Sequence, residues 1–262
     1  MIGPAGVMSL VLAETVSGAI GFLFLTPLWS EVRQGFFLLV GSIVLALVLA
    51  TAAAARAGYD PKAPGGRVAA ILALALAGTT LGWLALLAFK LRAAARLVGV
   101  LTVPIAVAML LAFARTADQS VGLAFFQLLA GAGFTGAVLD GLLLGHWYLT
   151  DRKLTRGPIN RMALLLAVAV VLDAAAVIAG GFGSTSQTQA ASNSLNPLLS
   201  ISGSASLIAI GMVACTGLIA VFIRLTLRGT RPSAVQSATG FFYLAVITAF
   251  VAELAAKIKF LP

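Results

Sequence analysis

Cysteine and histidine are scarce in this chain of 262 residues, and each scarcity excludes a class of chemistry. Cys215 is the single cysteine, which excludes an intrachain disulfide, a cysteine-ligated iron–sulfur cluster and a CxxC redox pair. His146 is the single histidine, which excludes bis-histidine haem ligation within the chain. No HExxH, GxSxG or phosphate-loop motif occurs. We therefore expect no metal site and no cofactor held by a ligand set of this chain.

Charged residues are also few, at 10% of the chain, whereas 61% of the residues are hydrophobic and the mean hydropathy is +1.08. A soluble domain carries roughly 25% charged residues. The hydrocarbon core of a bilayer is about 30 Å thick and needs about 20 apolar residues per helix. The chain supplies such runs in succession, which predicts an all-α, polytopic integral membrane bundle in contact with lipid.

Eight spans are predicted from the apolar runs. They lie near residues 6–28, 36–55, 68–89, 95–114, 121–149, 162–181, 201–223 and 240–258. The connections are too short to fold separately, so residues 1–262 form one transmembrane domain. The first run lacks the basic start of a signal peptide, and we expect it to be a retained span.

The seventeen Lys and Arg residues fall between the apolar runs, which indicates topology signals and not a nucleic-acid surface. Eleven follow odd-numbered spans: Arg33, Lys90, Arg92, Arg96, Arg152, Lys153, Arg156, Arg161, Arg224, Arg228 and Arg231. Six lie on the other side: Arg56, Lys62, Arg67, Arg115, Lys257 and Lys259. The excess predicts a cell-membrane protein with both termini outside and no nucleic-acid partner.

A shift of about 120 residues brings short patterns of the two halves into register. The matching pairs are Gly21 with Gly141, Glu31 with Asp151, and Arg33 with Lys153. One interpretation is two four-helix units, 1–115 and 116–262. The other is chance similarity among apolar helices.

Five ionisable residues inside the predicted spans stand out as candidates. They are Glu14, Asp140, His146, Asp173 and Glu253. A charge at the middle of a bilayer costs roughly 2.5 to 3.5 kcal/mol on insertion scales. Each of these residues is therefore a candidate for handling a proton, a cation or a quinone.

Glu14, Asp173 and Glu253 are expected at one depth, in the outer halves of their spans. Gly18 lies on the same helical face as Glu14 and lets another helix approach it closely. Three acids at one level repel if all are ionised, which points to a shared proton, a paired charge or a bound cation. The alternatives are that each acid bonds a different helix, or that Glu253 reaches the interface beside Lys257.

The fifth span combines a stripe of small residues with Asp140. The stripe consists of Gly133, Ala137, Gly141 and Gly145, a pattern typical of close helix packing. His146 follows Asp140 by six residues, which is a turn of 600°, so the two side chains point about 120° apart. Only a ligand or a water chain could join them.

His146 is followed by Trp147 and Tyr148, which makes this helix end a candidate ligand site. Imidazole can exchange a proton and a hydrogen bond with a quinone, and the neighbouring rings could stack on it. The alternative is that all three anchor the helix at the membrane interface.

Eight spans without a soluble domain, in two potential four-helix units, together with Glu14 near Gly18 and Gly21, resemble the NrfD or polysulfide-reductase type of membrane subunit. The resemblance lies in the architecture of most of the chain. It implies quinone binding between helices, partner subunits that carry redox centres and, in some members, proton handling. The residues that could carry such roles here are Glu14, Asp140, His146 and Asp173.

Three functional hypotheses follow. The first is an integral subunit of an electron-transfer or respiratory complex, with a quinone or proton site but no cofactor of its own. Its only part in catalysis would be as a subunit of a membrane oxidoreductase. The second is a small ion-coupled transporter in which Glu14, Asp173 and Glu253 bind the driving cation. The third is a structural anchor or assembly subunit.

Overall fold

The computed structural model describes residues 3–58, 65–151, 153–181, 201–229, 231 and 233–258. The uncharged segment 182–200, which we expected outside the membrane, lies outside the described residues. Within the described ranges all regular structure is helical.

Eight long helices and one short one make up the described part of the chain. They are α1 (Gly3–Leu25), α2 (Leu28–Glu31), α3 (Gln34–Ala57), α4 (Gly66–Ala88), α5 (Arg92–Ala114), α6 (Val121–Thr150), α7 (Gly157–Ala179), α8 (Ile201–Leu227) and α9 (Ser233–Ile258). Eight of them are long and apolar enough to cross a membrane. The predicted all-α bundle of eight spans is therefore confirmed.

The largest difference from the predicted boundaries is at the start of α9, which begins at Ser233 and not near residue 240. The polar stretch before residue 240 is helical because it packs against α6. A side chain at Gly145 would place its Cβ 2.3 Å from the Thr239 hydroxyl, so the glycine makes room for this turn of α9. Tertiary packing overrides the local polarity here.

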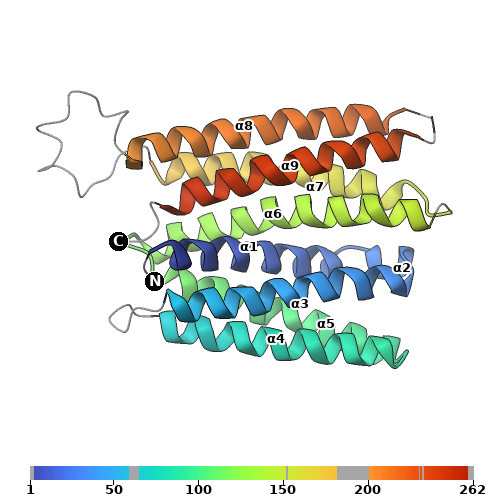
Figure 1. The fold of residues 1–262 in the computed structure, drawn as a ribbon, viewed down its shortest axis with the longest axis horizontal. Coiled ribbons are helices and arrows are strands. Elements are labelled where there is room, and N and C mark those ends of the chain that lie inside the picture. Colours follow the sequence, from blue (N-terminus) through green and yellow to red (C-terminus); the bar gives the residue numbers. More distant parts are fainter. Residues whose placement is uncertain are drawn as a thin grey trace, which may run out of the picture.

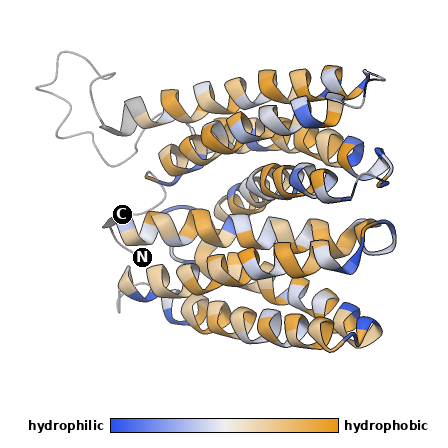
Figure 2. Ribbon diagram, turned by 45° about the vertical axis from the view of Figure 1, so that its right-hand side comes forward, coloured by the Kyte–Doolittle hydropathy of each residue, from blue (hydrophilic) through white to orange (hydrophobic). Residues whose placement is uncertain are grey.

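Large apolar side chains cover the outside of the bundle, as expected of a surface that meets lipid. Leu74, Val171 and Ile247 are each more than 60% exposed. Figure 2 shows hydrophobic colour along the lengths of the helices and hydrophilic colour gathered mainly at their ends. Most of the charged residues buried in the interior belong to the site described below.

The helices form two four-helix bundles that lie side by side (Figure 1). In the first bundle, α1, α3, α4 and α5 pack in a ring, and in the second, α6, α7, α8 and α9 do the same. The bundles meet mainly along α1 and α6. The two bundles correspond in extent to the predicted units 1–115 and 116–262. An origin by duplication is not tested by this arrangement.

The two ends of the molecule differ in charge. We call the end where α1 starts and α9 finishes the terminal end, and the other, which carries the ion pairs described next, the basic end. Two ion pairs connect the bundles at the basic end. Arg33 Nε lies 3.1 Å from Asp151 Oδ2, and both terminal nitrogens of Arg161 lie 2.9 Å from the Glu31 carboxylate.

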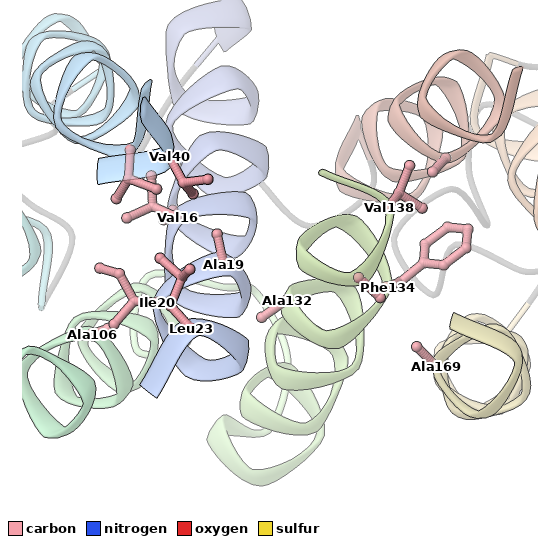
Figure 3. Close-up of a cluster of buried hydrophobic side chains, with 14 of the residues drawn as sticks. Val16, Ala19, Ile20, Leu23, Val40, Ala106, Ala132, Phe134, Val138 and Ala169 are labelled. Atoms are coloured by element: carbon pink, nitrogen blue, oxygen red, sulfur yellow. The ribbon is translucent and has the colours of Figure 1, made fainter. Parts of the chain in front are cut away.

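One apolar core extends through both bundles, with small residues where the bundles meet. Figure 3 shows Ile20 and Leu23 of α1 pointing into the first bundle, and Phe134 of α6 pointing into the second. Between the bundles the backbones of α1 and α6 touch. A Cβ built on Gly18 would lie 1.7 Å from the carbonyl oxygen of Ala132, and one on Gly136 would lie 2.4 Å from the carbonyl carbon of Gly18. We call this contact the glycine seam.

Candidate functional site

The most unusual side chain in the interior is Lys257, in the last turn of α9. Its side chain is only 3% exposed. The Nζ atom lies 2.8 Å from Oε1 of Glu14 on α1 and 2.9 Å from Oε2 of Glu253, one turn earlier on α9. Both glutamates are buried. One ammonium group thus joins two carboxylates across the boundary between the bundles.

Asp173 of α7 completes the group. Its side chain is 2% exposed, and it lies close enough to Glu253 and Lys257 for their charges to interact. The three acids that the sequence analysis expected at one depth are therefore brought together. We call Glu14, Asp173, Glu253 and Lys257 the acid–lysine cluster.

The lysine was the residue that sequence reasoning missed. The spacing of Glu253 and Lys257 suggested a pair at the interface, and the pair does form, but in the interior. The i, i+4 spacing was the available signal. The sequence predicted one depth for Glu14 and Asp173, but it does not indicate which helices bring them together with Lys257.

Glycine on α6 positions Glu14. A Cβ at Gly131 would lie 2.6 Å from the Glu14 Oε1 atom, so any larger residue would displace the carboxylate. Gly131 precedes the seam glycine Gly136 by five residues, and Glu14 precedes Gly18 by one turn. The close approach of α1 and α6 therefore holds Glu14 at the boundary between the bundles.

The cluster has more hydrogen-bond acceptors than protein donors. In the described part of the chain, Oε2 of Glu14, Oε1 of Glu253 and Oδ2 of Asp173 receive no hydrogen bond. Three ionised carboxylates and one ammonium would also carry a net negative charge. A proton shared between two carboxyl groups supplies a donor and reduces this charge at the same time.

A small cavity connects the cluster with the terminal end. Its volume is about 60 Å³, which is room for several water molecules. Asp173 and Lys257 lie on its wall, as do Gln119, Gln127 and Ser206. Gln119 donates to the side-chain oxygen of Gln127, and Gln127 donates to the Ala176 carbonyl at 3.2 Å. The cavity thus has both polar and apolar walls, and two members of the cluster lie on it.

Asp140 lies apart from the cluster, on α6. Its side chain is completely buried, and neither carboxylate oxygen has a hydrogen-bond partner among the described residues. Asp140 follows Gly136 by four residues and so lies on the same face of α6, toward the basic end. Nine residues separate it from Gly131, which is about 14 Å along a helix. It stands between the cluster and the basic end.

His146 makes its contacts on the surface of the second bundle. Its Nε2 atom lies 2.6 Å from the hydroxyl of Tyr243 on α9, and its Nδ1 atom lies 3.3 Å from the Leu142 carbonyl oxygen. Since a carbonyl only accepts, Nδ1 carries the hydrogen in the neutral ring and Nε2 accepts from Tyr243. The Tyr243 side chain is about half exposed, on the surface that faces lipid. No hydrogen bond joins His146 to Asp140, as their spacing predicted.

Trp147 and Tyr148, the candidate stacking residues, are held by packing at the basic end. The Trp147 ring lies 6.1 Å from that of Phe36, edge to face, and fills the space above Gly35. The Tyr148 hydroxyl donates to the Thr155 carbonyl. In this structure Tyr243, and not either of these two residues, is the ring beside His146.

Among the described residues, no group of three or more His, Cys, Asp or Glu side chains is arranged to hold a metal ion. Comparison with known proteins gives no match to a family model, to a curated protein or to a solved structure.

Proposed function

We propose that this protein handles protons within the membrane, and that the acid–lysine cluster is where it does so. The observation that carries the proposal is Lys257, buried between Glu14 and Glu253 beside a cavity at the terminal end. A buried ion pair costs several kcal/mol per ion in desolvation and is a poor way to add stability. Ionisable groups inside a membrane bundle are rare and commonly mark ion or proton pathways.

The geometry suggests how a proton would pass. Asp173 is the carboxyl group of the cluster that lies on the cavity wall, so it is the acid that would exchange a proton with the terminal side. Glu253 and Glu14 follow, and both lie within 3 Å of the same ammonium group. When one of the two glutamates takes up a proton, the Lys257 ammonium group can move closer to the other, ionised one. This small movement shifts positive charge across the boundary between the two bundles. Asp140 is the next buried acid toward the basic end.

The resemblance to NrfD-type subunits favours a redox partner as the source of energy. The protein would then be the membrane subunit of an electron-transfer complex, in which partner subunits hold the redox centres. Under this proposal the chain co-purifies with a larger assembly. The basic end would face the cytoplasm, because eleven of the seventeen Lys and Arg residues are predicted there.

The test is proton movement in proteoliposomes that contain the assembly that co-purifies with the chain, or the chain itself if it purifies alone. A pH-sensitive dye inside the vesicles reports flux after a membrane potential is applied or the redox partners are supplied with electrons. We expect Glu14→Gln to lower the flux at least about tenfold, as loss of an essential proton-transfer group does. Asp118→Asn is the matched control, because Asp118 is an acid at the same end but exposed.

Wild-type flux in a folded Glu14→Gln protein would refute the proposal. Loss of assembly in Glu14→Gln, with no flux difference in the protein that does assemble, would instead support the structural-anchor hypothesis. Flux that depends on a solute gradient would identify the protein as an ion-coupled transporter with the same site.

A second candidate function, quinone binding, rests on the His146–Tyr243 pair. This hydrogen-bonded pair lies at the lipid-facing surface, where a membrane-soluble quinone can reach it. A photoreactive quinone in native membranes should label the segment of α9 around Tyr243, and excess unlabelled quinone should prevent this. Labelling that is spread evenly over the lipid-facing helices would contradict the quinone site.

A further inference from the structure

A groove runs between α3 and α4 on the outside of the first bundle, at the terminal end and away from the acid–lysine cluster. Its apolar walls include Leu49, Ile71 and Leu74, and Arg56 and Arg67 lie at its mouth. The volume is about 730 Å³. We call it the α3–α4 groove.

The charged side chains of the groove lie near the membrane surface, and its apolar side chains lie deeper in the membrane. Arg56 is in the last turn of α3 and Arg67 is in the first turn of α4, so both lie where the helices leave the hydrocarbon region. Leu49 is seven residues before Arg56, or about 10 Å deeper along the helix. This is about a third of the 30 Å core. An occupant must therefore have a polar head at the arginines and an apolar chain below it.

The two arginines favour an anion as the head. Both are exposed, and in the described part of the chain neither forms an ion pair. Arg33 and Arg161 at the basic end, by contrast, each face a carboxylate. Two guanidinium groups suit a phosphate, because each offers parallel N–H donors. Both arginines also lie on the side of the membrane with fewer Lys and Arg residues. The excess of basic residues that sets membrane orientation is on the other side, so it does not explain these two.

We propose that the α3–α4 groove binds an anionic phospholipid, with its phosphate between Arg56 and Arg67 and one acyl chain along Leu49, Ile71 and Leu74. Basic sites between transmembrane helices recognise anionic headgroups in this way. The lipid would fill the outer side of the first bundle and fasten α3 to α4. This proposal does not depend on the proton handling proposed for the acid–lysine cluster.

Native mass spectrometry of the detergent-purified protein, titrated with phosphatidylglycerol or phosphatidylcholine, tests this inference. The wild type should bind phosphatidylglycerol saturably and in preference to phosphatidylcholine. The double variant Arg56→Gln/Arg67→Gln should bind it roughly 30-fold more weakly, since each basic group near a membrane surface contributes about a factor of five. Arg92→Gln/Arg96→Gln removes the same charge from exposed positions at the basic end and should keep wild-type affinity.

A variant that keeps both arginines separates the groove from general charge attraction. Ala53→Trp fills the groove without altering its charge, and it should also lose the preference for phosphatidylglycerol. Size-exclusion chromatography confirms that each variant is folded. Equal losses in the two arginine pairs, or wild-type binding in Ala53→Trp, would overturn the proposal and indicate diffuse attraction to the lipid surface.

Discussion

The two bundles share a ring arrangement of four helices but differ in what lies inside them. The buried polar groups of the first bundle include Thr51 and Thr102, whose hydroxyls bond carbonyls of their own helices. The second bundle holds Asp140, Asp173 and Lys257. Glu14 is the residue of the first bundle that pairs with the second in its interior. The same ring of four helices thus encloses a mainly apolar interior in the first bundle and several buried ionisable side chains in the second.

The largest effect is expected from Lys257→Met. The substitution leaves two buried glutamates without their counter-charge, and breaking a buried pair in this way costs about 3 to 5 kcal/mol. Thermal unfolding in detergent measures the loss. Thr51→Val in the first bundle is the control and should cost about 1 kcal/mol or less. A triple variant, Lys257→Met with Glu14→Gln and Glu253→Gln, should recover much of the stability. If it does not, the lysine acts through packing.

Gly18→Ala should have the next largest effect, because it separates the bundles. Its methyl group would overlap the Ala132 carbonyl, and overpacking of this kind costs about 3 kcal/mol. Gly21→Ala is the matched control, since a Cβ there meets nothing within 4 Å. The measurement is the unfolding temperature of both variants. Equal values would show that the glycine seam does not hold the bundles together.

Tyr243→Phe should have a smaller effect, confined to the second bundle. The substitution removes the donor to His146 Nε2 at a half-exposed site, and we expect a loss of about 1 kcal/mol. Because the chain has one histidine, its imidazole ¹⁵N signals are assigned without ambiguity. They should shift in Tyr243→Phe and stay unchanged in Tyr148→Phe. An unchanged spectrum in the first variant would contradict the hydrogen bond.

The smallest effect is expected from Arg161→Gln, which breaks an ion pair between the bundles at the basic end. Partly exposed pairs contribute about 0.2 to 1 kcal/mol and are screened by salt. The difference from wild type should therefore shrink at about 1 M salt. If the stability difference between Arg161→Gln and wild type persists in high salt, the pair joins the bundles more strongly than a surface ion pair does.

The sequence predicted the fold well because bilayer thickness dictates helix length. All eight spans follow from apolar runs that need no knowledge of neighbours. The start of α9 was predicted too late, because Thr239 is helical through its contact with Gly145 on another helix. The short helix α2 was not predicted.

The candidate site could be predicted only in part. Buried acids are visible in a sequence as charges inside apolar runs, so Glu14, Asp173 and Glu253 were found. Lys257 and Tyr243 were not, because their partners Glu14 and His146 lie 243 and 97 residues away along the chain. Such pairings depend on which helices become neighbours, and hydropathy contains no information about this.

The glycine seam has a mechanical consequence. Glu14 lies one turn from Gly18 on the terminal side, and Asp140 lies one turn from Gly136 on the basic side. If the two bundles rock against each other, the point of closest backbone contact is the natural pivot. Rocking about it would widen the space around one acid while narrowing the space around the other. The two acids would therefore respond to such a movement in opposite ways.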